Sequence, residues 1–125
     1  MIRYIQKRAT TSGYENVQAL LCQPDDPMVP PGVDLVFISD VLNYVKHRKK
    51  WLSTLASQME PGSRLVIVEF KEGELPEGPP AEKKTPKAKM IRQVVSAGFR
   101  KTQDRPNLIL EQYVVEFKRI SPPQS

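Results

Sequence analysis

The sequence predicts one α/β domain built on a mostly parallel sheet with an antiparallel end. Two almost continuous apolar runs rich in Val and Ile, residues 33–39 (VDLVFIS) and 65–70 (LVIVEF), are typical of strands that are buried on both faces. Between them, residues 48–59 place their large apolar side chains on one helical stripe. The order strand, helix, strand predicts a βαβ unit with a right-handed crossover.

The two ends of the chain add further elements. Residues 99–104 and 108–118 are predicted as two strands joined by residues 105–107, a hairpin-like connection that makes them antiparallel. Residues 1–12 have helical periodicity, with apolar side chains on one face, and Gly13 closes this helix.

Two more elements complete the prediction of five strands and three helices. The short apolar run Val17–Cys22 has the length of a strand rather than a helix. A third helix is predicted to have Thr85 as its N-cap, Pro86 at its first helical position and Gly98 just past its end.

Composition limits the possible disulfide and metal sites, the cellular location and the kinds of partner. The 125 residues suffice for one domain. With one Cys and one His, the chain can form neither an internal disulfide nor a four-ligand Cys/His zinc site, so we expect no metal. No long apolar run predicts a membrane span, and no secretion signal is recognised at the start, so a cytoplasmic location is expected. The net charge of +5 allows an acidic partner without requiring one.

The prolines separate the regular elements from the loops. Residues 71–84 (KEGELPEGPPAEKK) lack hydrophobic periodicity and are predicted to be a mobile or disordered loop, a lid or binding loop being the alternative. Residues 121–125 are expected to be a flexible tail, which leaves 1–120 as the domain.

The order of these motifs resembles class I S-adenosylmethionine-dependent methyltransferases, most closely the type 11 group that includes quinone-biosynthesis enzymes. The resemblance rests on residues 33–45 (VDLVFISDVLNYV) followed by residues 60–70 (EPGSRLVIVEF), with a proline-interrupted loop before them and a strand hairpin after them. It implies a Rossmann-like sheet of which this chain carries the family's strands 3, 4, 5, 6 and 7. It also implies that the chain is truncated, because strands 1 and 2 and the glycine-rich cofactor turn have no counterpart here.

The resemblance also implies where S-adenosylmethionine would be contacted. Gln23 falls where relatives commonly have an acidic residue that meets the adenine amino group, and Asp40 ends the strand that faces the cofactor and the substrate. Asn43 and Tyr44 fall at substrate-side positions. The alternatives from general protein chemistry are that Asp40 caps the following turn and that Tyr44 packs at the edge of the core.

Two further groups of polar side chains have simple structural explanations. Lys46, Arg48, Lys49 and Lys50 form a basic patch around the start of a helix, which we interpret as a solvated face, with an acidic or phosphate-bearing partner as the alternative and nucleic acid unlikely on the motifs present. His47 in the same run is assigned no role. Cys22 is predicted to be a buried core thiol rather than a nucleophile.

Without the family's first strands, residues 33–39 would present an unpaired strand edge. Residues 17–22 cannot easily pair parallel to this edge, because only ten residues, 23–32, connect the two. The edge can be covered by antiparallel rearrangement within the monomer or by a second chain. We expect a homodimer, formed either through this edge or by exchange of the N-terminal segment.

Three functions follow as hypotheses. The chain is a reduced methyltransferase whose site is rebuilt in a dimer, a non-enzymatic interaction module with a basic surface for an acidic partner, or the C-terminal part of a longer enzyme. Cofactor binding separates the first from the second.

Overall fold

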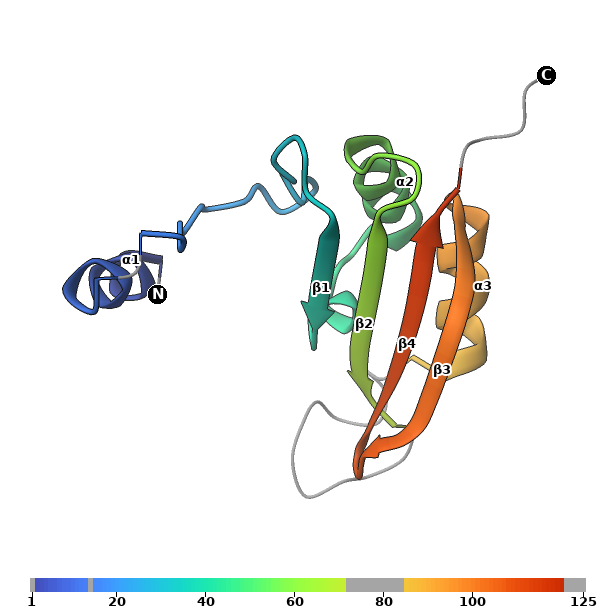
Figure 1. Cartoon of the computed structure of the whole chain (residues 1–125). Helices are drawn as coiled ribbons and strands as arrows, with labels where there is room; N and C mark the ends of the chain where they lie inside the picture. Colours follow the sequence, from blue (N-terminus) through green and yellow to red (C-terminus); the bar gives the residue numbers. More distant parts are fainter. Residues whose placement is uncertain (1, 14, 72–84, 121–125) are drawn as a thin grey trace.

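The computed structural model describes residues 2–13, 15–71 and 85–120, which form a sheet covered by two helices and an N-terminal arm with a third helix (Figure 1). In chain order the elements are α1 (Ile2–Thr11), β1 (Leu35–Ser39), the 3₁₀ helix η1 (Leu42–Tyr44), α2 (Arg48–Gln58), β2 (Arg64–Phe70), α3 (Lys87–Ser96), β3 (Phe99–Ile109) and β4 (Gln112–Arg119). The three α-helices lie close to their predicted bounds. Gly13 and Gly98 adopt positive φ just beyond α1 and α3, as expected of residues that end helices.

The sheet has the strand order β1-β2-β4-β3. β1 runs parallel to β2, whereas β4 is antiparallel to both β2 and β3. This arrangement confirms the predicted α/β class, the βαβ unit formed by β1, α2 and β2, and the antiparallel end.

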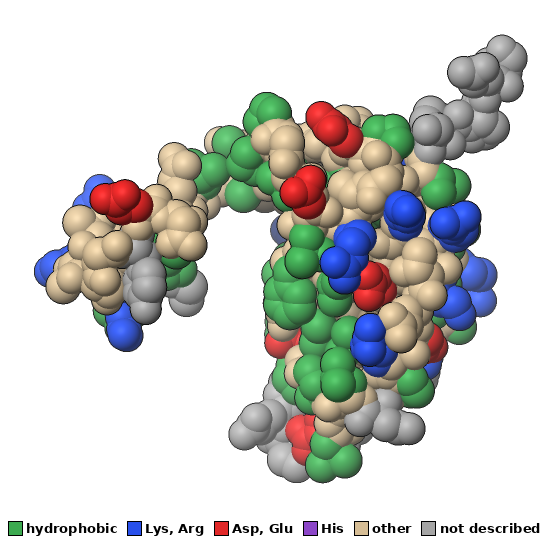
Figure 2. Space-filling model, viewed as in Figure 1, with side chains coloured by type: hydrophobic (Ala, Val, Ile, Leu, Met, Phe, Trp, Pro, Cys, Tyr) green, Lys and Arg blue, Asp and Glu red, His purple; other side chains and the backbone are tan. Residues whose placement is uncertain are grey.

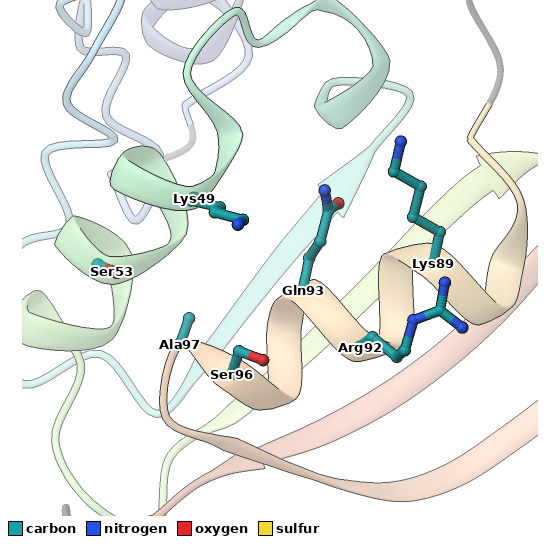
Figure 3. Close-up of a pocket in the computed structure, with 7 residues that line it drawn as sticks. All are labelled: Lys49, Ser53, Lys89, Arg92, Gln93, Ser96 and Ala97. Atoms are coloured by element: carbon teal, nitrogen blue, oxygen red, sulfur yellow. The ribbon is translucent and has the colours of Figure 1, made fainter.

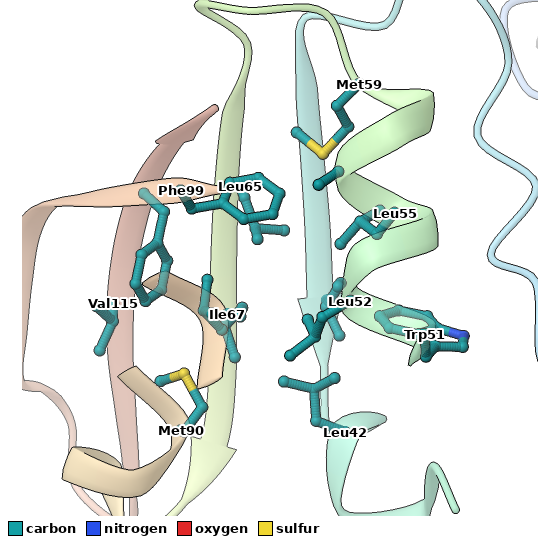
Figure 4. Close-up of a cluster of buried hydrophobic side chains, with 14 of the residues drawn as sticks. Leu42, Trp51, Leu52, Leu55, Met59, Leu65, Ile67, Met90, Phe99 and Val115 are labelled. Atoms are coloured by element: carbon teal, nitrogen blue, oxygen red, sulfur yellow. The ribbon is translucent and has the colours of Figure 1, made fainter. Parts of the chain in front are cut away.

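One face of the sheet is covered by α2 and α3, and the hydrophobic core lies between these layers (Figure 4). Leu52 and Leu55 of α2 contribute side chains that are fully buried, and Leu65 and Ile67 of β2 meet them from the sheet. The alternation of these strand residues with their neighbours follows from the two-residue period of a strand. The stripe predicted on residues 48–59 is therefore the core-facing side of α2.

The opposite face of the sheet carries no described helix, and β1 is exposed on it. Phe37 is 62% exposed and Leu35 is 46% exposed, so the prediction that this strand is buried on both faces is wrong. The two central strands, β2 and β4, are largely buried on both faces, because each has a strand on either side. Figure 2 shows hydrophobic side chains gathered over β1 and Lys and Arg side chains over the β3 side of the same face.

The N-terminal arm, residues 2–13 and 15–22, stands apart from the sheet in Figure 1. Val17–Cys22 was predicted as a strand, but these residues run extended without pairing to the sheet, and the Cys22 side chain is exposed rather than buried. These residues therefore have no neighbouring strand among the described residues. The arm is held locally, where the Ala19 amide donates to Oε1 of Gln6 at 2.9 Å.

The terminal hairpin turns later than predicted. β3 continues through Pro106 to Ile109, so the turn lies at residues 110–111 and not at 105–107. Pro106 is tolerated because β3 is an edge strand and its register with β4 shifts between Arg105 and Ile109. Cross-strand pairing therefore overrides the local turn signal.

The start of α3 differs from the prediction by one residue. Pro86 is the N-cap and makes no side-chain cap bond, whereas Thr85 was predicted to cap the helix. The Thr85 hydroxyl instead takes part in a tertiary hydrogen-bond network. The predicted mobile loop, apart from Lys71, and the predicted flexible tail lie outside the described residues. Within the described ranges, no helix has the length and apolar character needed to span a bilayer.

Candidate functional site

The polypeptide turns sharply after β1 at the carboxyl end of the parallel strands. Asp40 adopts a φ of 59°, and its amide donates to the carbonyl of Val68 at 2.9 Å, which ties the turn to β2. Its Oδ1 accepts from Nε2 of Gln112 at 2.7 Å, while Oδ2 accepts from the Ser39 hydroxyl at 3.3 Å. The carboxylate therefore joins the ends of β1 and β4, and the capping alternative is wrong because Val41 is the N-cap of η1, without a side-chain bond.

A buried carboxylate, Glu69, holds the following 3₁₀ turn. The residue is 1% exposed, and its two oxygens accept from the Leu42 amide at 2.8 Å and from Nδ2 of Asn43 at 2.9 Å. Burial raises the pKa of Glu69 to about 7, with a smaller upward contribution from Asp40, while the two hydrogen bonds and Arg48 act in the opposite direction. Glu69 thus titrates near neutral pH while it fixes the turn.

Arg48 holds the same turn from the other side. Its guanidinium donates to the carbonyl of Leu42 at 3.0 Å, to the Thr85 hydroxyl at 2.8 Å and to Oε1 of Gln93 at 3.1 Å. Its interpretation as part of a solvated face is therefore wrong, whereas Lys46, Lys49 and Lys50 are exposed as predicted. The positive end of the α2 dipole disfavours a cation at this position, and for Arg48 these three hydrogen-bond acceptors offset that repulsion.

Thr85 links the two halves of the network. Its hydroxyl donates to Oδ1 of Asn43 at 2.9 Å, and its carbonyl accepts from the Tyr113 hydroxyl at 3.2 Å. The Asn43 side chain is consequently engaged through both its donor and its acceptor. This geometry leaves Asn43 as a residue that shapes the turn.

A cavity of about 400 Å³ lies beside this turn and brings two distant parts of the sequence together. Its lining combines the loop that follows the arm with the turn and the start of the α2 region, namely Pro24, Asp25, Val41, Tyr44, Val45, Lys46 and His47. Tyr44 is 61% exposed, so it does not pack at the edge of the core. Gln23 directly precedes the lining residues, but its side chain is exposed and no hydrogen bond in the described chain joins it to Asp40.

The loop that carries Pro24 and Asp25 is anchored to α2. Oδ1 of Asp26 accepts from Nε2 of Gln58 at 2.6 Å and from the Met28 amide at 2.8 Å, and these bonds lower the pKa of Asp26. Oε1 of Gln58 accepts in turn from the Val29 amide at 2.8 Å. The cavity wall is therefore fixed to the helical layer even though the arm before it is not.

Sequence reasoning missed Glu69, Arg48, Thr85 and Gln112 as members of this site. A signal for Glu69 was present, since it shares strand parity with Leu65 and Ile67 and a carboxylate on a core-facing position needs partners. Gln112 had no local signal, because its role depends on the position of the hairpin turn. No cluster of three potential metal ligands occurs among the described residues.

Comparisons with known proteins agree on the fold. A family model described as "Methyltransferase domain" matches residues 1–112. A SAM-dependent methyltransferase from Aquifex aeolicus superposes with a TM-score of 0.85 at 21% identity, covering 95% of this chain and 63% of the other. A putative type 11 methyltransferase from Sulfolobus solfataricus gives a TM-score of 0.73 at 14% identity, covering 100% of this chain and 71% of the other.

A third solved structure has bound molecules in its description. The O-methyltransferase NcsB1 from neocarzinostatin biosynthesis, in complex with S-adenosyl-L-homocysteine and 1,4-dihydroxy-2-naphthoic acid, gives a TM-score of 0.77 at 18% identity, covering 95% of this chain and 39% of the other. No curated protein matches the chain. The chain thus spans less than two thirds of the length of the Aquifex structure.

Proposed function

Because the chain belongs to the methyltransferase-domain family, we propose that it forms one wall of a site for S-adenosylmethionine-dependent methyl transfer. The observation that carries the proposal is the rigid turn at the carboxyl end of β1, held by Asp40, Glu69 and Arg48 beside a cavity. Ligands of open α/β sheets bind at the carboxyl ends of parallel strands. The turn lies at that end of the parallel pair.

Each side chain of the wall has a distinct proposed task. Asp40 contacts the cofactor through Oδ2, whose only other described partner is the Ser39 hydroxyl, and Gln23 accepts from the adenine amino group through its amide oxygen. Tyr44, exposed in the cavity wall, faces the acceptor substrate. Asn43 positions the turn rather than touching the substrate, because both ends of its amide are already bonded.

The cofactor fits this wall only in part. When bound, S-adenosylmethionine supplies the electrophilic methyl group of its sulfonium, and the protein's contribution is chiefly alignment. No G-x-G sequence occurs in the chain, so the glycine turn that cradles a charged cofactor in such sheets has to come from elsewhere. The unpaired edge of β1 is the place where a further strand joins the sheet.

We propose that a complementary segment pairs with this edge, as in a longer enzyme. The test is co-expression with the part of the Aquifex relative that this chain does not span. S-adenosylhomocysteine is expected to raise the melting temperature of the complex but not of the chain alone, because ligand binding stabilises only a folded site. Binding by the chain alone, or none by a complex that does form, contradicts the proposal.

A matched pair of variants separates site chemistry from charge. Asp40→Asn is expected to weaken cofactor binding by the complex, whereas Asp34→Asn is not, because Asp34 precedes β1 at the opposite end of the strand. Equal binding by both variants would show that Asp40 does not contact the cofactor.

The exposed edge of β1 supports a second partner, another copy of this chain. Leu35 and Phe37 beside the edge and Leu20 and Leu21 in the arm are all exposed apolar side chains, so edge pairing or exchange of the arm would bury apolar surface. Light scattering at micromolar concentration is expected to give twice the 14.2 kDa chain mass. A single-chain mass would contradict the homodimer.

One variant distinguishes the two kinds of dimer. Leu21→Pro removes an amide from an exposed, unpaired part of the arm, so it blocks strand pairing by the arm without disturbing the sheet. Loss of the dimer in this variant favours arm exchange, and its persistence favours direct pairing of two β1 edges.

The non-enzymatic alternative predicts a different pattern. An interaction module with a basic surface shows no cofactor-dependent rise in melting temperature, in any assembly state, and binds an acidic partner with an affinity that falls as salt is added. The two readouts together therefore separate a methyltransferase site from an interaction surface.

A further inference from the structure

A second cavity, of about 460 Å³, lies on the outside of the helical layer between α2 and α3 (Figure 3). It shares no lining residue with the cavity beside Tyr44. Its polar lining consists of three cations and three neutral side chains: Lys49, Lys89, Arg92, Ser53, Gln93 and Ser96.

The three cations of this groove are not neutralised within the described part of the chain. The ion pairs found there are Arg64 with Glu116 and Lys87 with Asp104, and neither includes a groove residue. Lys49 comes from the first turn of α2, and Lys89 and Arg92 come from the first two turns of α3. Three like charges around one hollow produce a positive potential that favours an anion.

The neutral side chains add hydrogen-bond donors to this charge. Oε1 of Gln93 accepts from Arg48, so the amide nitrogen of Gln93 remains as a donor toward the groove. Figure 3 shows Lys49 extending from α2 toward the side of α3 that carries Gln93. Ammonium, guanidinium, amide and hydroxyl groups together are the donor set that phosphate oxygens accept from.

We propose that this groove binds a small phosphate-bearing anion. Its volume lies within the range of about 300–1,000 Å³ that is typical of small-molecule sites. A nucleic acid strand is a poorer match, because no aromatic side chain lines the groove and stacking on aromatic rings contributes much of single-strand binding. The inference is independent of methyl transfer.

Inorganic pyrophosphate is the probe that tests the site. In amide chemical-shift titrations of the full chain at low salt, saturable shifts are expected for residues 49–53 and 89–97, because these carry the lining side chains. Replacing Lys49, Lys89 and Arg92 together by Gln is expected to raise Kd by at least about tenfold. The affinity should fall with added NaCl.

The matched control removes the same charge elsewhere. Lys50, Lys101 and Lys118 are exposed and do not line the groove, and their joint replacement by Gln is expected to change Kd by less than about threefold. Equal weakening by both triple variants, shifts scattered over the surface, or no saturation at roughly 10 mM probe would overturn the proposal. Tighter binding of a single-stranded oligonucleotide through the same residues would also overturn it.

Discussion

The two faces of the sheet differ in their cover, and the difference is greatest at β1. On the face under α2 and α3, Leu65 and Ile67 of β2 are fully buried. On the other face, Phe37 of β1, which lies beside Val66 of β2, is 62% exposed. The chain supplies its own cover for the first face. Around β1, the second face has exposed apolar side chains without a described layer that would bury them.

The polar groups follow the same division. The buried carboxylate of Glu69 points to the covered face and is fully bonded, whereas the β1 edge carries unpaired backbone groups. Covering Phe37 alone would contribute about 2 kcal/mol. The contrast teaches that one face of a sheet in this family can be packed while the β1 edge stays unpaired among the described residues.

The largest expected effect comes from the covered face. Leu52→Ala removes a fully buried side chain of α2 and should lower the free energy of unfolding by about 2–5 kcal/mol, because a cavity remains. Phe37→Ala, a larger truncation, should lower the unfolding free energy of the monomer by less than about 1 kcal/mol. Urea denaturation measures both, and equal losses would show that β1 is covered in solution.

Substitution of Arg48 tests whether its hydrogen-bond network stabilises the fold as the buried face of the sheet does. Arg48→Ala removes three donors to the Leu42 carbonyl, Thr85 and Gln93, and should cost about 2–3 kcal/mol of unfolding free energy. Lys50→Ala, an exposed cation on the same helix, should change it by less than about 0.5 kcal/mol. Similar small losses for both would place Arg48 on the solvated face after all.

The pH dependence of stability tests whether Glu69 is buried on the covered face. Because its pKa is raised from 4.5 to about 7 in the folded chain, the native state retains a proton that the unfolded chain releases, and this contribution to stability disappears as pH rises from 4.5 through 7. Glu69→Gln cannot titrate, so the fall over this interval should be smaller in the variant than in the wild type. Denaturation at pH 5 and pH 8 measures it, and identical slopes would contradict the burial of the charge.

The smallest effect on folding is expected at the open face. Phe37→Asp places a charge on an exposed position and should change the unfolding free energy of the monomer by less than about 0.5 kcal/mol. If β1 receives a complementary segment or a second copy, the same variant should abolish that association, as measured by light scattering. Unchanged association would move the contact away from β1.

The elements that sequence alone predicted well are those whose own pattern matches their final surroundings. The stripe on residues 48–59 and the run at 65–70 became α2 and β2, and Gly98 followed α3 as its positive φ requires. The strand predicted at Val17–Cys22 did not form, because an apolar run also needs a neighbour to pair with. The turn was predicted at Pro106, but β3 continues through this residue because an edge strand tolerates a missing amide.

The site was less accessible to sequence reasoning than the fold. Asp40 and Tyr44 were identified through family resemblance, and the turn they occupy is well defined, but their contacts with cofactor and substrate stay predictions. Arg48 was misassigned because a run of basic residues carries no information about which member reaches a buried acceptor. Only the tertiary arrangement brings Arg48 to Thr85 and Gln93, which lie 37 and 45 residues away.

The irregular outer strand β3 determines what kind of assembly this sheet can enter. Its missing amide at Pro106, its two register shifts and its exposed cations Arg100 and Lys101 make it a poor template for another strand, whereas β1 at the opposite border is short and regular. If two copies pair through β1, the only borders left in the described sheet are the two β3 strands, where further strand addition is disfavoured. Such a pair is protected from the open-ended stacking that produces fibres.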